Sequence, residues 1–154
     1  GYGIVDFKNY TEGDTGCNLC QPAGGSKNPA SAYTVANKMH YVKQEGRVVF
    51  KKAVEEMTNI VVEMMKRNDL KSDDVNWLVP HQANKRIIDA TTRRANLSKD
   101  KVMINIQKYG NTTAGTIPLC LYEWEDKMKK GDNVILAAFG GGYTWGATYL
   151  TWGI

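Results

Sequence analysis

No stretch of the sequence approaches the roughly 18 consecutive apolar residues that a membrane-spanning helix needs. The first ten residues, GYGIVDFKNY, also lack the basic stretch followed by an apolar stretch that is typical of an export signal. Cysteine is scarce, and the odd number of three in a chain of this size favours a reducing compartment over a disulfide scaffold. We therefore expect a cytoplasmic protein that does not associate with membranes.

An excess of one charge sign is also missing. The 20 lysines and arginines stand against 16 acidic residues, a net charge of +4 that is too small to indicate nucleic-acid binding. The 42% hydrophobic and 23% charged residues are ordinary globular proportions and exclude a disordered chain. The length of 154 residues predicts one domain with a sizeable core.

Metal-binding patterns are limited to one CxxC, formed by Cys17 and Cys20. A structural zinc site needs four ligands, and no second CxxC or HxxxH follows. We therefore expect no metal site and interpret the two cysteines as ordinary thiols, with a metal or redox role as the alternative. His40, one of only two histidines, lies in the polar stretch NKMHY and is expected at the surface.

The chain divides into two parts. Residues 1–46 are rich in Gly, Asn, Ser, Thr and Pro and show alternation only over about residues 3–10, which predicts a strand followed by a long loop. Residues 47–154 are regularly patterned and predict an α/β core. Apolar residues at three-to-four spacing predict a long amphipathic helix from Arg47 to near Asn68.

The remaining pattern alternates between strands and helices. Strands are expected over residues 75–79, 102–106, 133–139 and 143–152, and helices over residues 83–95 and 113–129. Such alternation predicts the α/β class, with a mixed, largely parallel sheet that ends in an antiparallel pair.

Polar side chains follow two of these strands at the edge where α/β sheets bind ligands. His81, in VPHQANKR, and Asn111, in KYGNTTAGTIP, are 30 residues apart, so a right-handed crossover would bring them to the same edge. Imidazole and amide N–H groups are neutral donors that can hold a carbonyl oxygen as it gains negative charge. Alternatively, His81 is a buried residue at a helix start and Asn111 a capping or turn residue.

The three glycines at residues 140–142 are a third candidate feature. Glycine lets backbone N–H groups approach a ligand closely. A hairpin turn between two strands is the alternative interpretation. Phe139, just before the glycines, is then either a core residue or a wall of the ligand site.

Several long motifs occur together in one order. PHQAN at residues 80–84, YGNTTAGTIP at 109–118 and FGGGYTWG at 139–146 closely resemble the beta-ketoacyl-[acyl-carrier-protein] synthase III family, and PAGGSKNPAS and MHYVKQEGRVVFK resemble its middle region. The resemblance covers essentially the whole chain but only the family's C-terminal half. It implies the thiolase-like fold, a layered α/β/α/β/α architecture, of which residues 1–154 form the C-terminal half.

The resemblance also implies a Cys–His–Asn triad with His81 as its histidine and Asn111 as its asparagine. The nucleophilic cysteine lies in the family's N-terminal half, and none of Cys17, Cys20 and Cys120 matches it. This chain by itself is therefore expected to be inactive.

The implied reaction is a decarboxylative Claisen condensation that initiates fatty acid biosynthesis. An acyl group passes from acyl-coenzyme A to the cysteine and then condenses with malonyl-acyl carrier protein, giving 3-oxoacyl-acyl carrier protein. His81 and Asn111 would hydrogen-bond the malonyl thioester oxygen, and the backbone N–H of Gly141 would belong to the oxyanion hole. No cofactor or metal is implied. A related enzyme of secondary metabolism and an inactive fragment that binds carrier protein are the alternatives.

The resemblance further implies binding positions and partners. Gly46, Ala83 and Asn84 match positions that line the pantetheine tunnel, and Phe139 borders the reacting centre. Carrier-protein docking maps to Gln82, Ala83, Asn84, Lys85 and Arg86. The expected partners are acyl carrier protein, acyl-coenzyme A and the N-terminal half of the same enzyme, with a homodimer when complete.

Charge spacing supports a docking surface at the second helix of the core. On a helix that starts near residue 83, Arg86, Arg93 and Arg94 stand seven and eight residues apart and form a basic stripe. Lys51 could extend it. A basic stripe suits an acidic carrier protein, whose association it would steer.

Overall fold

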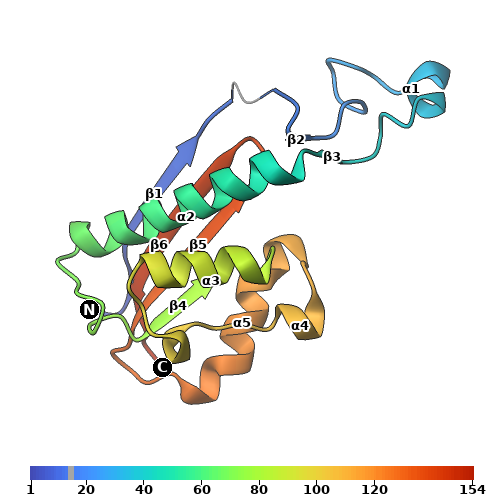
Figure 1. Cartoon of the computed structure of the whole chain (residues 1–154). Coiled ribbons are helices and arrows are strands. Elements are labelled where there is room, and N and C mark those ends of the chain that lie inside the picture. The colour runs from blue at the N-terminus through green and yellow to red at the C-terminus, as the bar shows by residue number, and fades with distance from the viewer. Residues whose placement is uncertain (14–15) are drawn as a thin grey trace.

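The computed structural model describes residues 1–13 and 16–154 (Figure 1). The strands and helices follow in the order β1 (Gly3–Thr11), β2 (Leu19–Cys20), α1 (Ala32–Ala36), β3 (Lys43–Gln44), α2 (Gly46–Arg67), β4 (Trp77–Pro80), α3 (Lys85–Arg94), α4 (Ile106–Tyr109), α5 (Thr116–Trp124), β5 (Asn133–Gly140) and β6 (Thr144–Thr151). Single turns of 3₁₀ helix lie at Lys99–Lys101, Thr113–Gly115 and Glu125–Lys127.

One sheet forms the centre of the molecule, with the strand order β1-β6-β5-β4. β4 runs parallel to β5, whereas β6 is antiparallel to both β5 and β1. The α/β class and the mixed sheet are as predicted, but the prediction of a largely parallel sheet is wrong. The short turn between β5 and β6 can only reverse the chain, and β1 pairs with β6 from almost the opposite end of the sequence.

Gly140 ends β5, and the next two glycines, Gly141 and Gly142, lie in the turn between β5 and β6. Gly142 has a φ of +139°, a region that residues with a Cβ rarely adopt, and a Cβ there would lie 2.9 Å from the backbone nitrogen of Thr144. The hairpin interpretation of residues 140–142 is therefore confirmed.

Residues 102–106 do not form the predicted strand. Val102 makes only an isolated parallel bridge to Leu78. The last two residues of the segment donate their N–H groups to the side-chain oxygen of Gln82, at 3.1 and 3.2 Å, instead of to a neighbouring strand. The chain consequently turns into α4 at Ile106.

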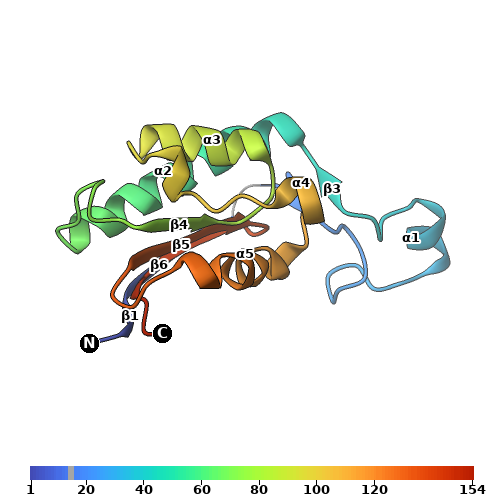
Figure 2. The same ribbon diagram turned by 90° about the horizontal axis from the view of Figure 1, so that it is seen from below.

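Helices cover both faces of the sheet (Figure 2). α2 and α3 lie on one face and α5 on the other. Leu78 and Ile135 belong to the core cluster formed with α2 and α3, whereas their neighbours Val79 and Val134 belong to a smaller cluster with α5. All four side chains are completely buried. Alternate residues of β4 and β5 thus serve opposite layers, as the pleat of a strand requires.

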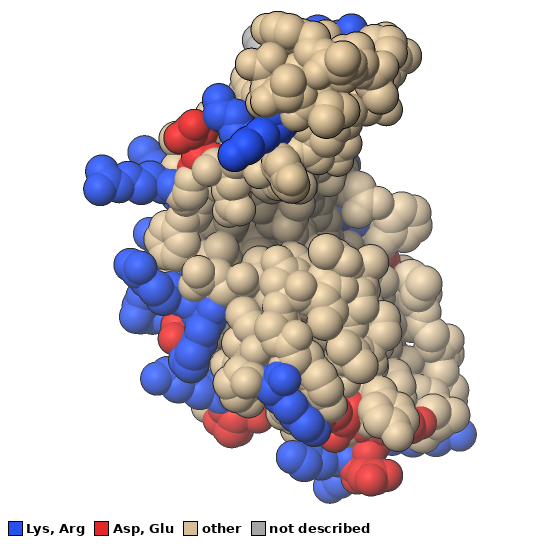
Figure 3. Space-filling view, turned by 90° about the vertical axis from the view of Figure 1, so that its right-hand side faces the viewer, with Lys and Arg blue, Asp and Glu red and all other residues tan. Residues whose placement is uncertain are grey.

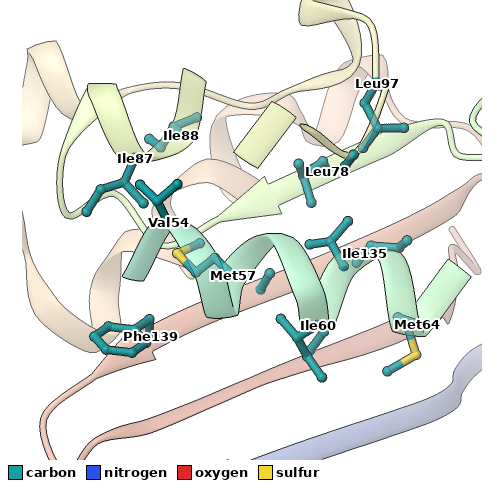
Figure 4. Packing of buried hydrophobic residues seen from close by; sticks show 14 of the residues in the cluster. Val54, Met57, Ile60, Met64, Leu78, Ile87, Ile88, Leu97, Ile135 and Phe139 are labelled. Carbon is teal, nitrogen blue, oxygen red and sulfur yellow. The ribbon is translucent and has the colours of Figure 1, made fainter. Parts of the chain in front are cut away.

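The helix α2 has the apolar stripe that its spacing predicts. Val54, Met57, Ile60 and Met64 are buried in the core (Figure 4). Burying each such side chain contributes about 1.5–3 kcal/mol, so packing against the sheet stabilises this helix. Although α2 has 22 residues, neither it nor any other described helix is long and apolar enough to cross a membrane.

The other two predicted helices have different boundaries. α3 begins at Lys85 because Asn84 is its N-cap, with a side-chain oxygen that accepts the N–H of Arg86 at 2.9 Å. The helix expected over residues 113–129 is trimmed at both ends, because Thr113 has a φ of +54°, which no α-helix accommodates, and a 3₁₀ turn follows from Glu125. Only the part named α5 is α-helical.

In the N-terminal part, the strand β1 is followed by a long segment, of which residues 14 and 15 lie outside the described residues. Beyond β1, the short strands β2 and β3 pair, and α1 projects away from the sheet (Figure 1). A disulfide joins Cys17 to Cys20, whose Cα atoms are 5.2 Å apart. The interpretation of these cysteines as two ordinary thiols is therefore wrong.

β1 is an edge strand with uncovered apolar side chains. Ile4, Val5 and Phe7 are 71%, 54% and 63% exposed. Asp6 fastens the strand to the end of α2 by accepting hydrogen bonds from Arg67, at 2.8 and 3.0 Å.

Candidate active site

A cleft of about 1380 Å³ opens beside the carboxyl ends of β4 and β5. Figure 3 shows the hollowed face of the molecule. The side chains or backbones of most predicted site residues line the cleft, namely Gly46, His81, Ala83, Asn84, Arg86, Asn111, Phe139 and Gly141. The structure therefore brings both loops with polar side chains to one place, as their spacing predicts.

His81 directly follows β4. Its backbone N–H donates to the carbonyl of Ala137 on β5, at 2.8 Å, which fixes the residue at the edge of the sheet. The ring is half-buried, and its Nδ1 lies 2.6 Å from the hydroxyl oxygen of Thr116. Burial lowers the pKa of His81 because it penalises the imidazolium. Burial therefore favours the neutral form of the imidazole.

Asn111 is placed by a tight turn after α4. Gly110 has a φ of +69°, which redirects the chain as it leaves the helix. The side-chain oxygen of Asn111 accepts the N–H of Thr113 at 2.9 Å. Because this bond occupies the oxygen, the amide NH₂ group, which has no partner among the described residues, remains available as a donor.

Thr113 itself has an unusual conformation. A positive φ, here +54°, is rare for a β-branched residue and is typically retained where the surroundings impose it. The hydrogen bond from its N–H to Asn111 holds this backbone in place.

A buried glutamine connects the two loops. Gln82 is completely buried, and its NH₂ group donates to the carbonyls of Pro80 and Met103, at 2.7 and 3.1 Å. Its oxygen accepts two N–H groups of the segment that precedes Asn111. Gln82 consequently has no atom to offer a docking protein, so its predicted docking role is wrong.

A second polar group supports the segment before Asn111. Glu123, on α5, accepts hydrogen bonds from Asn105 at 3.0 Å, Tyr109 at 2.8 Å and Lys108. The Lys108 ammonium above all holds the pKa of Glu123 at about 2. α4 is thereby fastened on one side by Gln82 and on the other by Glu123.

Sequence reasoning did not single out Thr116, which shapes the site. It also missed that Gln82 connects the two loops from inside the protein. The sequence signal for Thr116 is its position in the first turn of an expected helix, five residues after Asn111. The signal for Gln82 is its place beside His81, but an amide in a polar run looks the same whether buried or exposed.

The basic residues occupy different environments. Arg86 lines the cleft and stacks over Phe50, 5.2 Å from its ring centre. Lys85 forms an ion pair with Asp89 at 2.7 Å. Lys51, Arg93 and Arg94 are exposed outside the cleft. Figure 3 shows lysine and arginine side chains gathered along one side of the hollowed face.

The described part of the chain contains no cluster of three or more histidine, cysteine, aspartate or glutamate residues that could hold a metal ion. Cys120 is buried on α5, and its thiol donates to the side-chain oxygen of Asn105 at 3.2 Å. Burial raises the pKa of Cys120 to about 12, so this thiol does not ionise near neutral pH.

Comparisons with known proteins agree on one family. The family described as 3-oxoacyl-[acyl-carrier-protein (ACP)] synthase III C terminal matches residues 65–152. The beta-ketoacyl-[acyl-carrier-protein] synthase III of Porphyromonas gingivalis is 53% identical over 150 residues, covering 97% of this chain and 45% of the relative. The Chlorobaculum tepidum enzyme of the same name is 50% identical over 155 residues, covering 99% and 47%.

Solved structures are similar in the same way. The 3-oxoacyl-[acyl-carrier-protein] synthase III of Aquifex aeolicus has a TM-score of 0.81 at 38% identity, covering 97% of this chain and 44% of that one. The Thermus thermophilus enzyme has a TM-score of 0.85 at 36% identity, covering 99% and 47%. The chain thus spans less than half the length of these relatives and has their thiolase-like fold. The sequence identity, the family match and the shared fold together show that this chain belongs to the beta-ketoacyl-[acyl-carrier-protein] synthase III family.

Proposed function

We propose that this chain provides the C-terminal half of an acyltransferase that condenses an acyl-coenzyme A with malonyl-acyl carrier protein. The observation that carries the proposal is that His81 and Asn111 line one cleft from two separate loops. The side-chain oxygen of Asn111 is already occupied, which leaves its NH₂ group as a donor. The relatives' names supply the reaction class, a synthase acting on acyl-carrier-protein substrates.

In the proposed reaction, a cysteine of the N-terminal half attacks the acyl-coenzyme A thioester and retains the acyl group while the coenzyme A thiolate leaves. Malonyl-acyl carrier protein then loses carbon dioxide, and the electron pair of the broken bond forms a thioester enolate. His81 and Asn111 would stabilise the enolate oxygen. The enolate carbon attacks the acyl-cysteine, and the cysteine leaves as a thiolate. The backbone N–H of Gly141 would stabilise the oxyanion of this last step.

Substrate binding follows the lining of the cleft. Gly46, Ala83 and Asn84 lie where a pantetheine arm would pass, and the buried ring of Phe139 would wall the reacting centre. Arg86, with Lys51, Lys85, Arg93 and Arg94 around α3, would meet an acidic carrier protein. The proposal includes a cytoplasmic location, a homodimer of complete chains and no cofactor or metal.

A second candidate function, a non-catalytic carrier-protein-binding fragment, has one observation in its favour. None of the three cysteines lines the cleft: Cys120 is buried, and Cys17 and Cys20 are paired with each other. Under either proposal, the isolated chain forms no acyl-enzyme.

The test uses a complete synthase that carries this half. His81→Ala and Asn111→Ala should each lower malonyl-carrier-protein decarboxylation by about 10²–10³-fold, the usual cost of removing a preorganised donor. Mass spectrometry should still detect the acyl-cysteine in the Asn111→Ala enzyme. His40→Ala, at a histidine outside the cleft, is the matched control and should retain activity. Full decarboxylation by either cleft variant would refute the proposal.

A further inference from the structure

The hydroxyl group of Thr116 touches two polar atoms at once. Its oxygen lies 2.6 Å from Nδ1 of His81 and 3.0 Å from the carbonyl oxygen of Thr113. Thr116 is only 2% exposed, so no bulk solvent competes for these contacts. The residue begins α5 and lies at the inner wall of the cleft.

A hydroxyl group has one hydrogen to donate. The carbonyl of Thr113 can only accept, so the 3.0 Å contact uses that hydrogen. The 2.6 Å contact is then a hydrogen bond only if Nδ1 of His81 carries a proton and donates it. If the hydroxyl instead donated to Nδ1, its lone pairs would face the Thr113 carbonyl oxygen at 3.0 Å, which is repulsive.

We propose that Thr116 is a positioning residue that keeps the proton of neutral His81 on Nδ1 and presents an unprotonated Nε2 to the cleft. The inference rests on the proposed function, because it assigns successive roles to His81 within it. It differs from the sequence expectation, in which neutral His81 is itself an N–H donor.

The consequence is an order of events at Nε2. A bare Nε2 accepts the thiol proton of the nucleophilic cysteine: the S–H bond breaks, an N–H bond forms, and the electron pair remains on sulfur as a thiolate. Only the resulting imidazolium can donate from Nε2 to a substrate oxygen. Donation to the malonyl thioester therefore requires charged His81, whereas the amide of Asn111 donates in every state.

Among the described residues that line the cleft, none is an acidic partner for the ring of His81. The charged residues among those that line the cleft are Arg47 and Arg86, and no carboxylate of the described residues lies there. Burial disfavours a positive charge on the ring of His81. The neutral hydroxyl of Thr116 thus fixes the ring's orientation without raising its basicity as a carboxylate would.

The test reads the protonated nitrogen directly, in the complete synthase labelled with ¹⁵N-histidine and assigned by comparison with His81→Ala. Above the pKa of His81, the ¹⁵N shifts of the wild-type ring should show a protonated Nδ1 and a bare Nε2. Thr116→Val, which has the same shape but no hydroxyl, should show a mixture of both tautomers, and Thr116→Ser should restore the wild-type spectrum. Thr92→Val, which removes another buried threonine hydroxyl on α3, is the matched control.

Kinetics provide the second measurement. Wild-type malonyl decarboxylation should fall as the pH rises through the pKa of His81. In Thr116→Val, kcat should fall about tenfold with little change in KM, and the fall with pH should become shallower. Thr116→Ser should retain the wild-type profile.

A protonated Nε2 in the neutral wild-type ring would overturn the inference, as would an unchanged spectrum in Thr116→Val. If Thr116→Val does not fold, the wild-type spectrum decides alone. The spectrum does not depend on turnover, so an inactive enzyme with a protonated Nδ1 would refute the proposed function and leave this inference standing.

Discussion

The side-chain oxygen of Gln82 accepts the backbone N–H of Asn105 at 3.1 Å, although 23 residues separate the two. This bond joins the loop that carries His81 to the segment that leads to Asn111. All hydrogen-bonding positions of the Gln82 amide are occupied by backbone groups. A completely buried side chain therefore helps to hold together the segments that carry the two predicted triad residues.

Replacing this connector should affect both stability and catalysis. Gln82→Met retains the volume but leaves buried backbone groups without partners, which should lower the free energy of unfolding by about 2–4 kcal/mol. Decarboxylation should fall more than acyl-enzyme formation, because only the former uses both loops. Thermal unfolding and the two half-reactions measure these effects. Gln107→Met, at an exposed glutamine, is the control, and equal behaviour of the two variants would contradict the prediction.

Glu123 should make stability depend on acidity. Its pKa is lowered from 4.5 to about 2 by Lys108, Tyr109 and Asn105. A lowered pKa means that the carboxylate stabilises the fold above pH 4.5 and loses this effect as the pH falls toward 2. The Tm difference between wild type and Glu123→Gln should therefore be full at pH 7 and shrink between those pH values. Glu55→Gln, at an exposed position of α2, should show no such trend.

The basic stripe should act on the carrier protein rather than on coenzyme A. Arg93→Glu, outside the cleft, should raise KM for malonyl-acyl carrier protein about tenfold at low salt and leave acyl transfer from coenzyme A unchanged. Arg86→Glu should likewise raise this KM and leave acyl transfer from coenzyme A unchanged. Added salt should reduce the difference from wild type. Lys130→Glu, which lies over Tyr2 near the chain end, is the control for charge alone. Equal loss in both half-reactions would count against docking at this surface.

The thiol of Cys120 should be unreactive in the folded protein. Its pKa of about 12 leaves almost no thiolate at pH 8, and the side chain is completely buried. Iodoacetamide should modify Cys120 only after unfolding, as followed by peptide mass spectrometry. Rapid labelling of the folded chain at this residue would contradict the burial described above.

The sequence predicts well where local pattern and motif coincide. The apolar spacing of α2 determines which face packs on the sheet. The two motifs that carry His81 and Asn111 line one cleft. The sequence predicts the relative directions of the strands less well, because the pairing of β1 with β6 joins residues from opposite ends of the chain.

Other errors came from side chains that replace backbone partners. Residues 102–106 have a strand-like pattern, but Gln82 takes the hydrogen bonds that a strand would need. The left-handed backbone of Thr113 delays the start of the helix expected from residue 113, and no residue type in that stretch signals it. Thr116, which contacts His81, is consequently the first residue of α5.

The open edge of β1 has a practical consequence for anyone who produces this polypeptide alone. No described strand pairs with the outer side of its nine residues, and three large apolar side chains stand exposed there. Such an edge is a template on which a second chain can add its own strand, which is a common route to aggregation. Co-expression with a segment that covers β1, or lysine substitutions at Val5 and Phe7, should therefore increase the fraction of the protein that remains in the supernatant.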